Sequence, residues 1–189
     1  MKANNCKQRY TGGFTLIEMV GVLAVIAILA ALLVPKVITA ISDAKYSNTV
    51  GAINTAKVAA TSFYSKAGQF TNDLGFHQTL LANGFLDAQY LSKVGTTSTV
   101  EVVPAPGGVG NAGYMLDGAT VGTSTTNTTS VVEAVIQGVA PSDAVEISRR
   151  LDGDAFTQTD VTAADTKGRV SYAAATNGTV TVYVYLMSK

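Results

Sequence analysis

Residues that commonly carry out chemistry are few in this chain of 189 residues. It has one histidine, His77, and one cysteine, Cys6, too few ligands for a zinc site built from Cys and His within one chain. These two residues are also far apart in sequence for a Cys–His dyad. We find no nucleophile–base pair, no phosphate-binding glycine loop and no carboxylate pair in a catalytic motif, so the sequence predicts no enzyme. Thirteen basic residues balance thirteen acidic ones, which gives no electrostatic footprint for nucleic acid.

One cluster near the C-terminus has the residue types of a metal site. Its members are Asp152, Asp154, Asp160 and Asp165. The segment begins D-x-D, as an EF-hand calcium loop does, but Phe156 stands where the third oxygen ligand belongs and Ala163 stands at the twelfth position. It is therefore not an EF-hand. We expect these acids to cap a helix and to lie in a solvated turn.

The most unusual ionisable residue is Glu18. Residues 14–34 read FTLIEMVGVLAVIAILAALLV, where only Thr15, Glu18 and Gly21 fall outside Ala, Val, Ile, Leu, Met and Phe. About twenty apolar residues form a helix that crosses the hydrocarbon core of a bilayer. A carboxylate is costly in such a span, and intramembrane ionisable residues mark function by default. We therefore predict a function for Glu18; the alternative is a side chain that only reaches the headgroups.

The segment before this span is polar and basic. Lys2, Lys7 and Arg9 are its charged residues, and basic residues stay on the cytoplasmic side of a membrane. We expect a single span, with the chain after Val34 outside the cytoplasm. A secretory signal peptide fits less well, because its apolar core is about 7–15 residues and a small-residue cleavage site follows it. A plain signal anchor fits the hydropathy but leaves Glu18 unexplained.

The string GFTLIE at residues 13–18, with its basic leader and the span that follows, resembles the prepilin signature shared by type IV pilins and type II secretion pseudopilins. In that family Gly13 corresponds to the glycine before the prepilin peptidase cut. Phe14 corresponds to the new N-terminal residue, which the same enzyme methylates. Glu18 corresponds to the assembly glutamate, and Pro35 to the proline that kinks or loosens the helix.

The resemblance, which is close over residues 13–70, implies how subunits assemble. Cleavage would expose an α-amino group at Phe14, one helical turn from Glu18. A buried carboxylate needs a partner, and the N-terminal ammonium of a neighbouring subunit would supply one and fix the axial register. The implied partners are further copies of this chain, prepilin peptidase, the inner-membrane assembly machinery and, before assembly, membrane lipid. Some pseudopilins hold calcium in a C-terminal loop, so calcium is the alternative at the four acids; no other cofactor is implied.

The elements that position these residues follow from the hydrophobic pattern. Helical spacing continues beyond Pro35 to a C-cap at Gly68. The expected stripe on this helix is Ile41, Ala44, Asn48, Ala52, Ala56, Ala59 and Phe63. After about Val50 we expect it to pack on the protein's own sheet. Further on we expect a short helical segment at 77–92 that is broken near Gly84, strands at 99–103 and 131–139, a helix at 142–152, and a hairpin of 169–175 with 179–187. His77 is expected to be a cap or core residue.

These expectations give an α+β fold resembling the pilin layout, in which a long N-terminal helix packs on a C-terminal antiparallel sheet. The leader would be residues 1–13 and the transmembrane, assembly half of the helix residues 14–35. The amphipathic half would be residues 36–70, and the variable loop and sheet head residues 71–189. Val180, Val182, Val184 and Leu186 would face the core, and Tyr183 and Tyr185 would face outward or toward a neighbour.

The function we expect is that of a structural subunit of a type IV pilus-like filament. The Ser/Thr-rich stretch at 119–130 and the 176 residues left after cleavage favour a pilin. A type II secretion pseudopilin is the alternative, because it shares every N-terminal feature. A monomeric membrane-anchored binding module would leave the Gly13–Phe14 junction and Glu18 unexplained. The subunit would reside in the bacterial inner membrane and then in a periplasmic or cell-surface filament.

Overall fold

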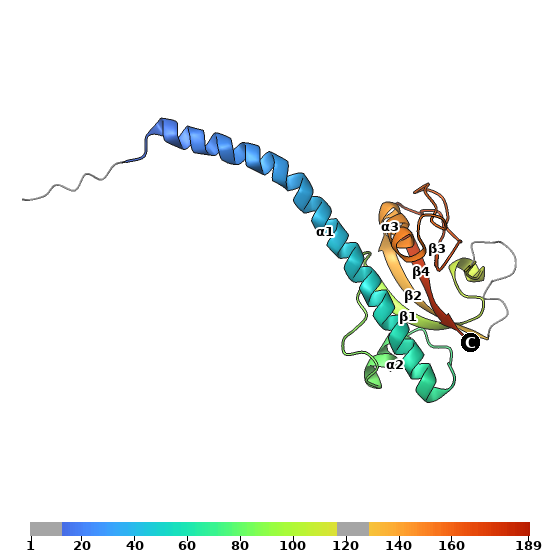
Figure 1. Ribbon diagram of the computed structural model, residues 1–189. Helices are drawn as coiled ribbons and strands as arrows, with labels where there is room; N and C mark the ends of the chain where they lie inside the picture. The colour runs from blue at the N-terminus through green and yellow to red at the C-terminus, as the bar shows by residue number, and fades with distance from the viewer. Residues whose placement is uncertain (1–12, 117–128) are drawn as a thin grey trace, which may run out of the picture. The chain divides into compact units, whose positions relative to one another are not determined.

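The computed structural model describes residues 13–116 and 129–189 (Figure 1). Most of the expected leader and most of the Ser/Thr-rich stretch at 119–130 lie outside the described residues. The chain divides into two units, Met1–Ser42 and Asp43–Lys189. Helix α1, Leu16–Ala67, begins in the first unit and ends in the second.

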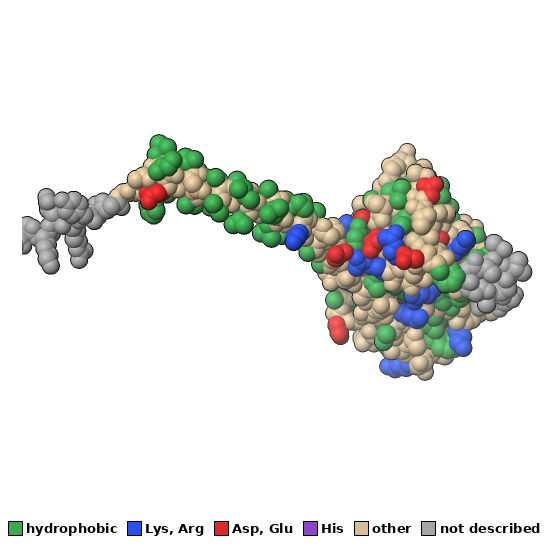
Figure 2. Space-filling view, turned by 45° about the horizontal axis from the view of Figure 1, so that its top comes forward, with side chains coloured by type: hydrophobic (Ala, Val, Ile, Leu, Met, Phe, Trp, Pro, Cys, Tyr) green, Lys and Arg blue, Asp and Glu red, His purple; other side chains and the backbone are tan. Residues whose placement is uncertain are grey.

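The first unit contains the apolar part of α1. Every large apolar side chain from Phe14 to Ile41 is exposed there, and Figure 2 shows these side chains along the helix. Of the described helices, α1 is the one long and apolar enough to cross a membrane. The helix continues through Pro35, which has no N–H to donate to the preceding turn, and Thr39 Oγ1 donates to the Pro35 carbonyl at 3.1 Å. A kink at Pro35 stays a prediction.

The second unit is built around a four-stranded antiparallel sheet with the strand order β1-β2-β4-β3. The elements are α2 (Phe76–Ala82), β1 (Thr97–Pro104), a 3₁₀ turn (Val109–Asn111), β2 (Ser130–Val139), α3 (Pro141–Asp152), β3 (Val170–Tyr172) and β4 (Val180–Ser188). The second half of α1 packs on this sheet, so the predicted α+β, pilin-like layout is confirmed.

The main core lies between the second half of α1 and one face of the sheet. Side chains of β4 alternate as predicted, with Val180, Val182, Val184 and Leu186 buried. Small residues dominate the facing side of the helix, where Ala56, Ala59 and Ala60 are buried, and this lets the helix approach the sheet closely.

The predicted helix stripe is buried in its second half. Ile41, Ala44 and Asn48 are exposed, whereas Thr49 and Ile53 are buried. Packing on the sheet therefore begins close to Val50, as predicted. Ile41 lies in the first unit, where it continues the exposed apolar surface of the span.

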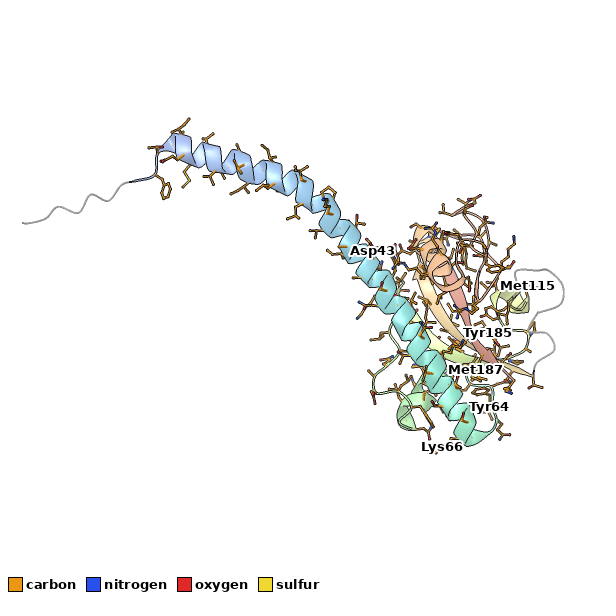
Figure 3. The ribbon with its side chains drawn as sticks, in the orientation of Figure 1. Asp43, Tyr64, Lys66, Met115, Tyr185 and Met187 are labelled. Carbon is orange, nitrogen blue, oxygen red and sulfur yellow. The ribbon has the colours of Figure 1, made fainter. Side chains whose placement is uncertain are left out.

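The second face of the sheet is also covered, which the sequence reading did not predict. Strand β2 is buried on both faces, and residues 105–116, which we call the cover segment, lie over Val131 and Glu133. Tyr114 of this segment lies against Tyr185 of β4, with ring centroids 5.5 Å apart, and Tyr185 is labelled in Figure 3. Tyr183 and Tyr185 are therefore half-buried beneath the chain's own loop rather than fully outward.

Several local predictions are confirmed and one strand prediction is too long. Gly68 ends α1 with a positive φ of 75°, and the Asn177-Gly178 turn has φ values of 56° and 77°, as a type I′ hairpin requires. The short helix α2 ends at Ala82, and the chain turns at Gly84 with φ 70°, which confirms the predicted break there. Strand β3 has three residues, not seven. His77 is 5% exposed, which confirms a core position.

Candidate processing and assembly site

The junction between Gly13 and Phe14 lies just before α1 begins. Both residues are outside the helix, and Phe14 is 80% exposed. A Cβ atom added at Gly13 would meet no atom within 4 Å, so packing within the described chain does not require a glycine there. The bond is therefore accessible and lies in a non-helical stretch.

Thr15 and Glu18 form a reciprocal pair at the start of α1. Thr15 donates to Glu18 Oε2 through both its backbone N–H and its hydroxyl, each at 2.8 Å. The Glu18 backbone N–H lies 3.3 Å from Thr15 Oγ1. This is a capping box, in which each side chain satisfies a backbone donor at the helix terminus. The T-x-x-E spacing could have revealed it in the sequence, but we predicted only an assembly role.

The capping box fixes where the Glu18 carboxylate points. It is held on the N-terminal side of the first helical turn, toward Phe14. A negative charge is favourable there, because the N-terminal end of a helix carries partial positive charge. No Lys or Arg among the described residues forms an ion pair with Glu18. The charge therefore remains available to a cation from outside this part of the chain.

The structure does not gather the four C-terminal acids into one site. Asp165 and the side chain of Asp152 are buried, whereas Asp154 and Asp160 are exposed. Within residues 13–116 and 129–189, no three His, Cys, Asp or Glu side chains are close enough to share a metal ion. Burial raises the pKa of Asp152, and hydrogen bonds from Val170 and Arg169 with the charge of Arg169 oppose that rise.

A buried carboxylate that the sequence reading missed is Glu133, which is 3% exposed. Its Oε2 accepts from the Gly108 N–H at 2.8 Å and from the Tyr114 hydroxyl at 2.7 Å. Burial raises the pKa of Glu133, and the hydrogen bonds from Gly108 and Tyr114 oppose that rise. The charge of Glu101, directly opposite on β1, raises the pKa further. The signal in the sequence was one charged residue within the apolar run VVEAVIQGV.

Charged side chains also join α1 to α3 where the second unit begins. Arg150 donates to Asp43 Oδ1 at 2.8 Å, and Asp143 accepts from Lys45 Nζ at 3.1 Å and from the Tyr46 hydroxyl at 2.7 Å. Asp43 is labelled on α1 in Figure 3. Burial, followed by the hydrogen bond to Asp143, raises the pKa of Tyr46 to about 12. These contacts hold α3 against the helix.

Comparison with known proteins bears on the N-terminal site. Residues 8–34 match the model of the prokaryotic N-terminal methylation motif. No curated protein and no solved structure matches the chain. The matched residues include the Gly13–Phe14 junction, the capping box and the apolar span. The chain thus carries the prepilin-type signature of type IV pilins and pseudopilins.

Proposed function

We propose that this protein is a structural subunit of a type IV pilus-like filament, polymerised through the first half of α1 after prepilin peptidase removes residues 1–13. The observation that carries the proposal is the exposed apolar helix with one carboxylate in its first turn. Such a surface needs lipid around it before assembly and other apolar helices around it afterward. The basic leader keeps the N-terminus cytoplasmic, and the second unit lies on the other side of the membrane.

In the proposed assembly step, Glu18 pairs with the Phe14 ammonium of a neighbouring subunit. Methylation of that amine keeps its positive charge. The capping box aims the carboxylate at the N-terminal end of the helix, where Thr15 supplies two of its hydrogen bonds. The neighbour's cation would complete the neutralisation inside an apolar bundle, where an unpaired carboxylate is strongly unfavourable.

The experiment separates the charge of Glu18 from its role as a cap. Glu18→Gln keeps an acceptor for the capping box but removes the charge, and Glu18→Val removes both. Thr15→Val is the matched control, because it removes the hydroxyl of the cap and leaves the charge of Glu18. For each variant, the mass of the membrane-bound protein reports processing, and fibres sheared from cells report assembly.

We expect every variant to lose residues 1–13. Fibres should be absent or strongly reduced for Glu18→Gln and Glu18→Val and present for Thr15→Val. Normal fibres from Glu18→Gln would show that the residue acts as a helix cap and not as an ionic partner. A mature protein that retains residues 1–13 would refute prepilin processing.

A deletion strain distinguishes the filament subunit from the pseudopilin. Loss of surface fibres with normal protein secretion supports the pilus-like role. Loss of secretion with fibres intact would assign the chain to a type II secretion system. If the deletion changes neither fibres nor secretion, and wild-type cells yield the protein only as a membrane-bound monomer, the tethered binding module is correct.

A further inference from the structure

Residues 153–169 connect α3 to β3 without forming a helix or strand. The four acids for which calcium binding is the alternative lie directly before this connection or within it: Asp152, Asp154, Asp160 and Asp165. An irregular segment of this kind needs side-chain or metal contacts to fix its conformation, and a bound cation is one way to provide them. The hydrogen bonds of the connection identify the groups that hold it here.

Asp152, the last residue of α3, is the first anchor. Its Oδ2 accepts from the backbone N–H groups of Arg169 and Val170 at 2.8 and 2.9 Å, and its Oδ1 accepts from Arg169 Nε at 3.2 Å. Only 3% of the Asp152 side chain is exposed. A Cβ atom at Gly168 would lie 2.5 Å from Asp152 Oδ2, so the chain passes too close for any larger residue.

The Arg169 guanidinium bonds more than one oxygen at this helix end. Besides the Asp152 carboxylate, it donates to the main-chain carbonyl of Leu151. Carbonyl groups in the last turn of a helix lack partners within the helix, and the helix end carries partial negative charge. A carboxylate and a free carbonyl are also the oxygen ligands that calcium prefers. The guanidinium thus occupies the oxygens that a metal ion would need.

Asp165 is the second anchor, and it uses other donors. Its Oδ2 accepts from the Ser148 hydroxyl at 2.9 Å and from the Gln158 N–H at 3.2 Å, and its Oδ1 accepts from the Lys167 N–H at 3.1 Å. Its backbone pairs with Tyr172 at 2.9 and 2.8 Å. Each carboxylate oxygen therefore already accepts from a donor of the chain.

The remaining two acids add no shared site. Asp154, whose side chain is 88% exposed, forms an ion pair with Arg149, and Asp160 accepts from the hydroxyl and N–H of Thr162. Calcium requires six to eight oxygen ligands around one point. The four acids do not provide that arrangement, so these residues do not fit a calcium ion.

We infer that Arg169 is the internal cation that closes the α3–β3 connection, so that this connection holds without calcium. The inference is independent of the proposed filament function, because it concerns the fold of the second unit alone. It makes Arg169 a positioning residue for β3, the short edge strand that follows it directly.

The test uses the full-length chain in detergent micelles, unfolded by heat and followed by circular dichroism, because the protein has no tryptophan. Arg169→Met and Asp152→Asn should each lower Tm by roughly 5–10 °C, since each leaves a partly or fully buried partner unpaired. Asp154→Asn is the matched control in the same connection. It should shift Tm by no more than about 2 °C, because its ion pair is exposed.

Two further measurements decide the cause. The double variant of Arg169→Met and Asp152→Asn should lower Tm by less than the sum of the decreases in the two single variants, because both substitutions break the same interaction. Wild-type Tm should be the same in millimolar calcium and in chelator. A rise of several degrees with calcium would mean that the acids hold the metal, by ligand linkage. An Arg169→Met protein that melts like wild type would also overturn the inference.

If Arg169→Met fails to fold, Arg169→Lys gives the same decision. Lysine keeps the positive charge but lacks the planar fork that reaches a carboxylate and a carbonyl together. We expect a Tm between those of wild type and Asp152→Asn, with no response to calcium. A wild-type Tm for Arg169→Lys would show that the fork is not what closes the connection.

Discussion

Replacing Glu133 with alanine gives the sharpest test of how the cover segment is held to the sheet. The carboxylate is 3% exposed and accepts from the Gly108 N–H at 2.8 Å and from the Tyr114 hydroxyl at 2.7 Å. Both donors belong to the cover segment. Without Glu133 these two hydrogen bonds between the sheet and the cover segment are lost.

The size of the effect follows from those two contacts. A buried donor that loses its acceptor costs about 1–3 kcal/mol, and a hydrogen bond to a charged group is worth about 1.5–3 kcal/mol. Glu133→Ala should therefore lower the free energy of unfolding by about 3–5 kcal/mol. That loss corresponds to roughly 6–20 °C in Tm for a chain of this size. Tyr114→Phe removes one of the two contacts and should have about half the effect.

The pH dependence supplies a second readout. Burial raises the pKa of Glu133 in the folded protein, with a contribution from Glu101. Between the unfolded pKa and this raised value, the folded state binds more protons than the unfolded state. Stability from this group is thus fully present below the unfolded pKa and is lost as pH rises through the folded pKa. Glu133→Gln should remove that part of the dependence, because glutamine does not titrate.

Thermal melts of the full-length chain in detergent, recorded from acidic to neutral pH, measure both effects. Glu133→Ala and Tyr114→Phe proteins that both melt within about 2 °C of wild type would refute the anchoring role, because the loss of these buried hydrogen bonds should lower Tm by more than that. An unchanged pH slope in Glu133→Gln would show that another group titrates there.

Two further predictions concern the rest of the second unit. Asp143→Ala should lower the pKa of Tyr46 from about 12 toward its ordinary value, because the substitution removes the carboxylate that accepts from the Tyr46 hydroxyl at 2.7 Å. Ultraviolet titration of tyrosinate measures this pKa, and an unchanged titration would contradict the prediction. Gly138→Ala should destabilise the protein by more than about 2 kcal/mol in thermal melts, because the φ of Gly138 is +66° and a Cβ there would lie 2.5 Å from Thr96 Oγ1. The control is Gly51→Ala, at a helix position where a Cβ would meet nothing within 4 Å, and it should not destabilise the protein.

Features that depend on neighbouring residues could be predicted from the sequence. The turn at Asn177-Gly178, the alternation along β4 and the end of α1 at Gly68 each result from local chemistry. The prepilin-type string at residues 13–18 is equally local. Its capping box was also readable, because T-x-x-E needs only four consecutive residues.

Features that depend on distant segments could not be predicted in this way. The partner of Asp152 is Arg169, across an irregular connection, and the partners of Glu133 come from the cover segment and not from a regular element. The phase of the helix stripe was also ambiguous. Small residues occur on more than one side of α1, so burial of Thr49 rather than Asn48 depends on where the sheet meets the helix.

The two halves of α1 require different surroundings, and this constrains what the protein can do. Burying a large apolar side chain is worth about 1.5–3 kcal/mol, and those from Phe14 to Ile41 are all exposed in the first unit. From Asp43 onward the helix has polar contacts to α3 and a small-residue face on the sheet. The first half is therefore stable only in lipid or among other apolar helices. Because Glu18 is the single ionisable residue from Phe14 to Val34, the environment that covers this half must also accommodate its charge, which the proposed pairing with the Phe14 ammonium of a neighbouring subunit would do.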